Sequence, residues 1–115
     1  MTRRQERVSE QIHRAISELL TFQTQDPRLA GVTVTNVDIT GDLRRATVYV
    51  QPRATQAETV ELLEGLQHAH GYLRRQVAER LQLRFAPELR FAIDENTANE
   101  SHIQELIDQL SRGTS

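Results

Sequence analysis

The feature that most constrains this chain is an apolar stripe too long for one straight helix. From Gln56 to Leu83 apolar residues recur every three or four positions, which is typical of a helix with one buried face. Such a helix would extend for about 42 Å, whereas a compact chain of 115 residues has a diameter of roughly 34 Å. We therefore predict a break within about two residues of Gly71, because an interior glycine weakens a helix by about 1 kcal/mol relative to alanine. Gly65 is the alternative position.

An amphipathic helix is also predicted near the start of the chain. Its apolar residues are spaced for one buried face, and Thr2 and Gln5 fit a capping box at its beginning. The segment "QDPRLAG" then ends the helix, because proline disfavours helical geometry in the residue before it.

Three segments show the alternation of β-strands. The alternation in "VTVTNVDI" shifts phase near Thr35–Asn36, which predicts a β-bulge, and the turn "TGDL" leads into a second strand, "RRATVYVQ". A third strand, "PELRFAID", follows the long helical region. We expect it to pair in parallel with the second strand, since helices rather than a tight turn connect the two.

A last helix is predicted after a capping box formed by Thr97 and Glu100. The resulting order, αββααβα, indicates an α+β fold with one three-stranded sheet and helices on one face. We expect a single domain over residues 1–111 and a frayed end over residues 112–115. The chain has no cysteine, and we find neither a signal peptide nor a long apolar run, which favours a soluble cytoplasmic protein and argues against a membrane partner.

No group of residues indicates catalysis. His68 and His70 would point about 200° apart on a helix, so they cannot share a metal ion unless the helix unwinds. Asp94 and Glu95 are adjacent at a strand end, where turn chemistry or entry into a helix explains them better. Glycine-rich phosphate loops are absent from the sequence. We expect a protein without enzymatic activity, metal or cofactor.

A binding surface is the alternative to a catalytic site. Residues 41–90 contain eight arginines against six acidic residues, and the arginines could hold phosphates while Tyr49 stacks a base. The same residues could instead form ordinary solvated ion pairs, with Tyr49 covering the sheet. Composition and spacing leave the two interpretations nearly even.

Three long segments resemble one known family. They are "RVSEQIHRAISELL", "DPRLAGVTVTNVDITGDLRRATVYV" and "LQHAHGYLRRQVAERLQLRFAPELRFAIDE". They are similar to ribosome-binding factor A of bacteria and organelles, and the resemblance covers roughly residues 3–110 in order. It implies a KH-like fold of the second type. In that fold Ala69-His70-Gly71 would stand at a helix kink where other KH domains carry a glycine-rich loop.

The resemblance also implies a function. Members are non-enzymatic assembly factors that bind the free small ribosomal subunit and assist late maturation of its rRNA, notably at the 5′ end, with importance for growth in the cold. We expect a monomer that contacts the subunit and its rRNA. Two other classes remain open, a protein adaptor that docks by its sheet face and an unrecognised hydrolase-type enzyme. The residues that the resemblance assigns to RNA and ribosome binding are Ala69, Gly71, Arg74, Arg75, Arg44, Arg45, Arg80 and Arg84.

Overall fold

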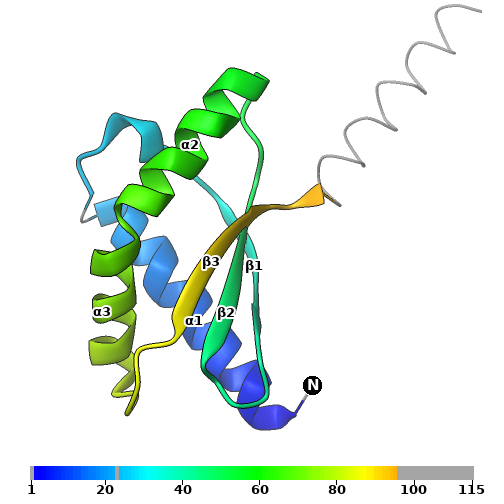
Figure 1. Cartoon of the computed structure of the whole chain (residues 1–115), viewed down its shortest axis with the longest axis vertical. Coiled ribbons are helices and arrows are strands. Elements are labelled where there is room, and N and C mark those ends of the chain that lie inside the picture. The colour runs from blue at the N-terminus through cyan, green and yellow to red at the C-terminus, as the bar shows by residue number, and fades with distance from the viewer. Residues whose placement is uncertain (1, 23, 96–115) are drawn as a thin grey trace, which may run out of the picture.

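Helices and strands follow one another in the predicted order as far as the structure extends (Figure 1). The structure is a computed structural model that describes residues 2–22 and 24–95. Its elements are α1 (Arg3–Phe22), the short 3-10 helix η1 (Pro27–Leu29), β1 (Val34–Ile39), β2 (Arg45–Val50), α2 (Gln56–His68), α3 (His70–Leu81) and β3 (Glu88–Ile93). The predicted last helix with its capping box, and the predicted frayed end, lie outside the described residues.

The sheet has the strand order β1-β2-β3. β1 and β2 are antiparallel, and their register shifts between Val34 and Asn36, which confirms the predicted bulge. β2 and β3 are parallel, with Ala46 beside Leu89 and Val48 beside Phe91, as the helical connection between them requires. β2 is therefore the central strand, bonded on both sides.

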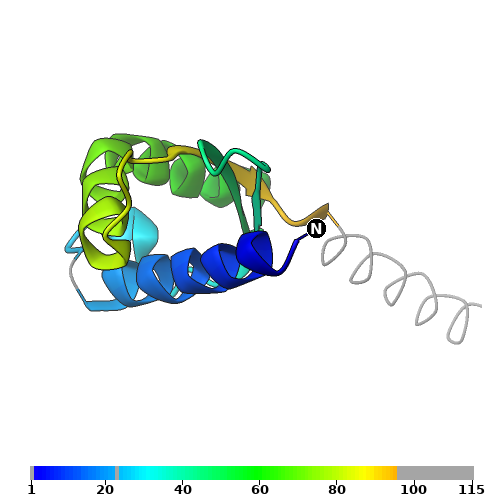
Figure 2. The ribbon, with the colours of Figure 1, turned by 90° about the horizontal axis from the view of Figure 1, so that it is seen from below.

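One face of the sheet forms half of the core. Val37, Ile39, Val48 and Leu89 are buried on this face, whereas Asn36, Asp38, Arg45 and Arg90 are exposed on the other. The buried side chains pack against apolar residues of the helices, and the sheet and α1, α2 and α3 surround this common core (Figure 2). The prediction of helices on one face of a three-stranded sheet is confirmed.

The predicted helix starts are held by their side chains. At the start of α1 the Gln5 N–H donates to the Thr2 hydroxyl (3.1 Å), and the Thr2 N–H donates to the Gln5 side chain (3.0 Å). At the start of α2 the Glu58 N–H donates to the Thr55 hydroxyl (3.1 Å). Each contact satisfies an N–H group that has no partner inside the helix, so these helices begin where the sequence indicates.

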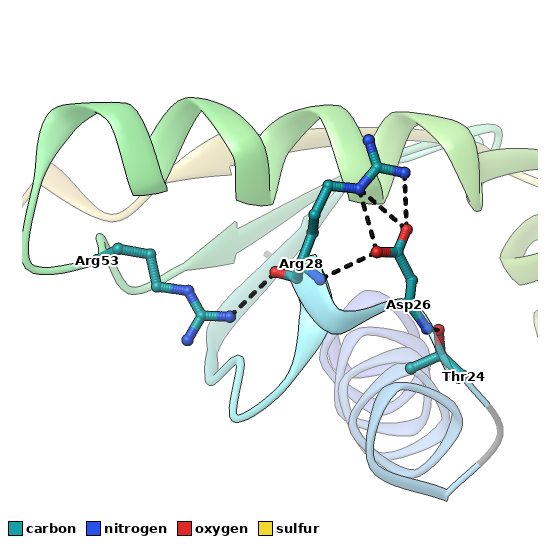
Figure 3. A network of polar contacts seen from close by, with 4 residues as sticks. All are labelled: Thr24, Asp26, Arg28 and Arg53. Atoms are coloured by element: carbon teal, nitrogen blue, oxygen red, sulfur yellow. Dashed lines mark hydrogen bonds and ion pairs between the residues drawn. The ribbon is translucent and has the colours of Figure 1, made fainter.

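A polar network holds η1 together and links it to the segment before α2 (Figure 3). The Asp26 carboxylate accepts hydrogen bonds from the Arg28 backbone (2.9 Å) and from its guanidinium (2.7 Å), which lowers the pKa of Asp26. The Arg53 guanidinium donates to the carbonyls of Arg28 (3.2 Å) and Ala30 (2.7 Å). Gly65 of α2 lies against this turn, because a Cβ there would be 3.0 Å from Leu29 Cδ2 and 3.1 Å from Arg28 Cβ. The glycine therefore permits close packing of η1 on α2.

The long helical stripe is broken at Ala69, within the predicted distance of Gly71. Ala69 separates the two helices with φ −84° and ψ −1°, at the edge of the α-helical region, and the axes of α2 and α3 diverge there (Figure 1). Gly71 itself lies inside the first turn of α3, and its φ is not in the left-handed region. The predicted break within about two residues of Gly71 is confirmed, and the residue between the two helices is Ala69.

Candidate nucleic-acid interface

The helix kink presents bare backbone to solvent. Gly71 is exposed, and a Cβ added to it would meet no atom within 4 Å. Ala69 at the bend is half-buried against the core, and no side chain caps the start of α3. No steric reason inside the described fold requires a glycine at position 71. The open space leaves room for the backbone of a ligand to approach α3 closely.

Arg74 is engaged within the protein. Its guanidinium donates to the carbonyls of Pro87 (3.2 Å) and Ala86 (3.1 Å) and lies 3.5 Å from a Glu88 carboxylate oxygen. The other oxygen of Glu88 is 3.2 Å from His70 Nε2, and the His70 ring contacts Phe91 edge-on. Arg74 lies about one turn after the bend at Ala69 and therefore links α3 to the start of β3.

Arg80 also has a partner. Its guanidinium donates to Glu18 Oε2 at 3.0 Å, which joins α3 to α1. Such a partly exposed pair contributes little to stability. It nevertheless places a carboxylate beside the Arg80 guanidinium, which makes Arg80 less available to a phosphate group.

Four of the predicted arginines remain available for a ligand. Arg44, Arg45, Arg75 and Arg84 are exposed, and none has an ion pair with a carboxylate within the described residues. Arg44 lies near Asp42, whose pKa is lowered by the Thr40 hydroxyl, by the Arg44 backbone N–H and by the Arg44 charge. That carboxylate already accepts from the Thr40 hydroxyl at 2.6 Å and from the Arg44 N–H at 3.1 Å.

Phe85 was not predicted from the sequence as a candidate binding residue. This phenylalanine lies in the loop between α3 and β3 and is 61% exposed. The guanidinium carbons of Arg44 and Arg84 are each 5.5 Å from its ring centroid. The structure therefore brings two predicted arginines from distant segments together on one aromatic ring.

The outer face of the sheet is a poor place for Tyr49 to stack a base. Tyr49 is half-buried beside a hollow of about 420 Å³ that Asp38, Asp94 and Glu95 also line. Carboxylates at this position repel phosphate groups. The geometry favours the interpretation in which Tyr49 covers the sheet.

Other chemistry finds no support in the described part of the chain. Over residues 2–22 and 24–95, no three His, Asp or Glu side chains gather in a way that could hold a metal ion. Within the same ranges, no helix is both long and apolar enough to cross a membrane.

Comparisons with known proteins agree on one family. The model of the family described as ribosome-binding factor A matches residues 4–107. The ribosome-binding factor A of Acetivibrio thermocellus is 40% identical over 107 residues, which cover 92% of this chain and 87% of that protein. The one from Macrococcus caseolyticus is 38% identical and covers 97% and 98% of the two chains.

Structural comparison leads to the same family. The crystal structure of ribosome-binding factor A from Thermus thermophilus superposes with a TM-score of 0.68 at 28% identity, covering 77% of this chain and 94% of that one. A homology model of the Thermus thermophilus factor, fitted into a cryo-electron microscopy map of its complex with the 30S subunit, superposes with a TM-score of 0.59 at 30% identity. It covers 73% of this chain and 88% of that one.

Proposed function

This chain belongs to the ribosome-binding factor A family, and from that membership we propose its function and its binding surface. It is a non-catalytic ribosome assembly factor that binds the small ribosomal subunit and takes part in its maturation. The single observation that carries this conclusion is the family match over residues 4–107, which covers all the helices and strands of the described fold except Arg3, the first residue of α1. We place its action in the cytoplasm, as a monomer, late in subunit assembly and at the 5′ end of the rRNA.

The proposed mechanism is selective binding. A factor without catalytic groups can only favour the state of its partner to which it binds more tightly, by as much as the two affinities differ. We propose that the chain stabilises one conformation of the maturing rRNA until processing is complete. Its effect is then largest in the cold, because misfolded RNA helices cross their barriers more slowly.

The proposed binding surface combines the kink with the available arginines. Arg44, Arg45, Arg75 and Arg84 supply positive charge for phosphate groups, and Gly71 leaves the backbone of α3 open to close approach. Among the other predicted residues, Ala69 supplies the bend. We assign Arg74 and Arg80 to positioning α3 against β3 and α1, because their guanidinium groups already have partners.

Depletion of the protein tests the proposed function in cells. We expect the protein to sediment with free small subunits rather than with translating ribosomes. Loss of the protein should make subunits with unprocessed rRNA ends accumulate, more so at low temperature. Sucrose-gradient sedimentation, with mapping of rRNA ends, measures both effects.

Purified components provide the control for this experiment. The protein alone should leave precursor rRNA uncleaved, since it acts by binding. Cleavage by the purified protein, or normal subunit maturation in depleted cells in the cold, contradicts the proposal.

Gly71→Ala tests whether Gly71 is needed for the fold or for binding to the small subunit. Gly71→Ala should keep or raise the free energy of unfolding, by up to about 1 kcal/mol, because alanine is the better helix former. The added methyl group should nevertheless weaken association with small subunits, because it occupies the open space at the start of α3. Urea denaturation and co-sedimentation measure the two quantities.

Gly65→Val is the matched control for Gly71→Ala. Its side chain would collide with the packed turn around Leu29, so it should lower the free energy of unfolding. If Gly71→Ala binds subunits as well as the wild type, the open backbone at the kink is not part of the interface.

A further inference from the structure

We propose that Phe85, with Arg44 and Arg84 beside it, is a stacking site for one unpaired RNA base, and this inference rests on the proposed function. Phe85 comes from the α3–β3 loop and Arg44 from the β1–β2 hairpin, 41 positions away in the sequence. Both guanidinium carbons lie over the ring, 5.5 Å from its centroid, so a base that stacks on Phe85 displaces one of the two guanidinium groups. Phe85 is 61% exposed, so much of the side chain remains open to solvent.

The surroundings of the ring are shaped to receive a small polar aromatic group. A hollow of about 210 Å³ is lined by Phe85, Leu43, Leu83 and the charged residues Arg4, Asp42, Arg44 and Arg84. Three cations thus face one carboxylate, and that carboxylate already accepts from Thr40 and from the Arg44 backbone. The residues that line the hollow therefore carry a net positive charge, and Phe85 supplies an aromatic ring on one side of it.

The backbone on both sides of the cluster is held in an uncommon conformation. Leu43 (φ 60°) and Gln82 (φ 52°) are the only residues other than glycine with positive φ in the described ranges. Leu43 immediately precedes Arg44, and Gln82 stands two residues before Arg84. Both conformations have a local cause, because Gln82 is the left-handed C-cap of α3 and Leu43 lies in the β1–β2 turn, where its N–H donates to the Thr40 carbonyl. They fix where the two loops that carry Arg44 and Arg84 leave the neighbouring elements.

The chemistry of the cluster favours unpaired RNA over a duplex. Bases in a duplex are stacked on one another, whereas unpaired bases can stack on aromatic side chains and on arginine planes. Arg44 and Arg84 would hold the neighbouring phosphates, and Phe85 would hold the base. Maturing rRNA contains such unpaired segments, which gives the site a ligand that the proposed function supplies.

Phe85→Leu tests the stacking site, because leucine keeps an apolar side chain but lacks an aromatic face. Binding of a single-stranded RNA of about twelve nucleotides should weaken by about fivefold to one hundredfold, with an unchanged salt slope. Binding of an RNA duplex of the same length should not change. Phe22→Leu is the matched control, since Phe22 is 79% exposed in α1 and should bind like the wild type. Fluorescence anisotropy with labelled RNA measures all four variant and ligand combinations.

A second variant reports the contact directly. The chain contains no tryptophan, so Phe85→Trp introduces a single fluorophore at the site. Single-stranded RNA should quench its emission by stacking, while Phe22→Trp should remain unquenched. Three results would each overturn the stacking site. Phe85→Leu could bind single-stranded RNA as tightly as the wild type, Phe85→Leu could lose as much affinity for the duplex as for the single strand, or the wild type could fail to bind the single strand.

Co-sedimentation with small subunits distinguishes failure of the stacking site from failure of the proposed function. If the wild type does not sediment with small subunits, the proposed function itself is wrong. If Phe85→Leu loses subunit binding but keeps single-stranded RNA binding, the ring contacts a ribosomal protein, which also overturns the stacking site.

Discussion

The combined substitutions Arg44→Gln, Arg45→Gln, Arg75→Gln and Arg84→Gln are expected to weaken binding of single-stranded RNA by on the order of a thousandfold at about 50 mM salt. These four arginines are the members of the predicted site that are exposed and have no ion pair with a carboxylate among residues 2–22 and 24–95. The logarithm of the binding constant falls linearly with the logarithm of the salt concentration, and each phosphate contact to a single strand steepens this salt slope by about 0.7. At about 50 mM salt, loss of one such contact therefore lowers the affinity nearly tenfold. Titrations between roughly 50 and 200 mM salt measure the affinity and the slope, which should flatten by close to three units.

A matched pair of double variants controls for the loss of net charge. Arg44→Gln with Arg84→Gln removes two positive charges from the cluster, and Arg7→Gln with Arg14→Gln removes two from the exposed surface of α1. The first pair should lose about one hundredfold in affinity and the second much less. Equal losses would mean that the arginines act only through the net charge of the protein.

Leu66→Ala is expected to lower the free energy of unfolding by about 2–5 kcal/mol. Leu66 is fully buried in α2, one turn before the bend at Ala69, and belongs to the core shared by the helices and the sheet. A small domain has only about 5–15 kcal/mol of stability in total, so this single truncation removes a large part of it. Denaturant titration monitored by circular dichroism measures the change.

Val60→Ala is the control on the same helix. Val60 is 47% exposed, so its truncation should change the free energy of unfolding by about 0.5 kcal/mol or less. A comparable loss for both variants would show that α2 does not pack through the side that carries Leu66.

Local sequence signals predicted the elements and their pairing. The phase shift of the apolar positions predicted a bulge near Thr35–Asn36, where the register shifts between Val34 and Asn36. The capping box of Thr2 and Gln5 predicted the start of α1. Both features depend on residues close together in the chain, which is why the sequence alone could indicate them. The parallel pairing of β2 and β3 followed instead from the helical connection between them.

The roles of the two helical glycines could not be read from the pattern. Glycine weakens a helix wherever it occurs, so the sequence offered Gly65 and Gly71 as sites for one break. The structure instead bends at Ala69, uses Gly65 for close packing against Leu29, and leaves Gly71 in open space. These differences depend on the distance to a neighbouring element, which periodicity does not contain.

The surroundings of the candidate binding residues could be predicted only in part. Charge and family resemblance indicate eight candidate residues, but which of the arginines form ion pairs within the described residues depends on partners far away in the sequence. Arg80 meets Glu18, and Arg74 meets Glu88 and the carbonyls before β3. Phe85 was missed because no local pattern distinguishes an exposed phenylalanine from a buried one.

The parallel pairing of β2 with β3 sets the order in which the binding surface is completed during folding. A β-hairpin such as β1–β2 closes within about 1–10 μs. In contrast, 37 residues separate the end of β2 from the start of β3, so this pairing must overcome a larger loss of chain entropy and forms later. The β3 pairing also places the α3–β3 loop, which brings Phe85 to Arg44. A partly folded chain therefore lacks the assembled cluster of Arg44, Arg84 and Phe85, and we expect the proposed RNA binding to begin only after this pairing has formed.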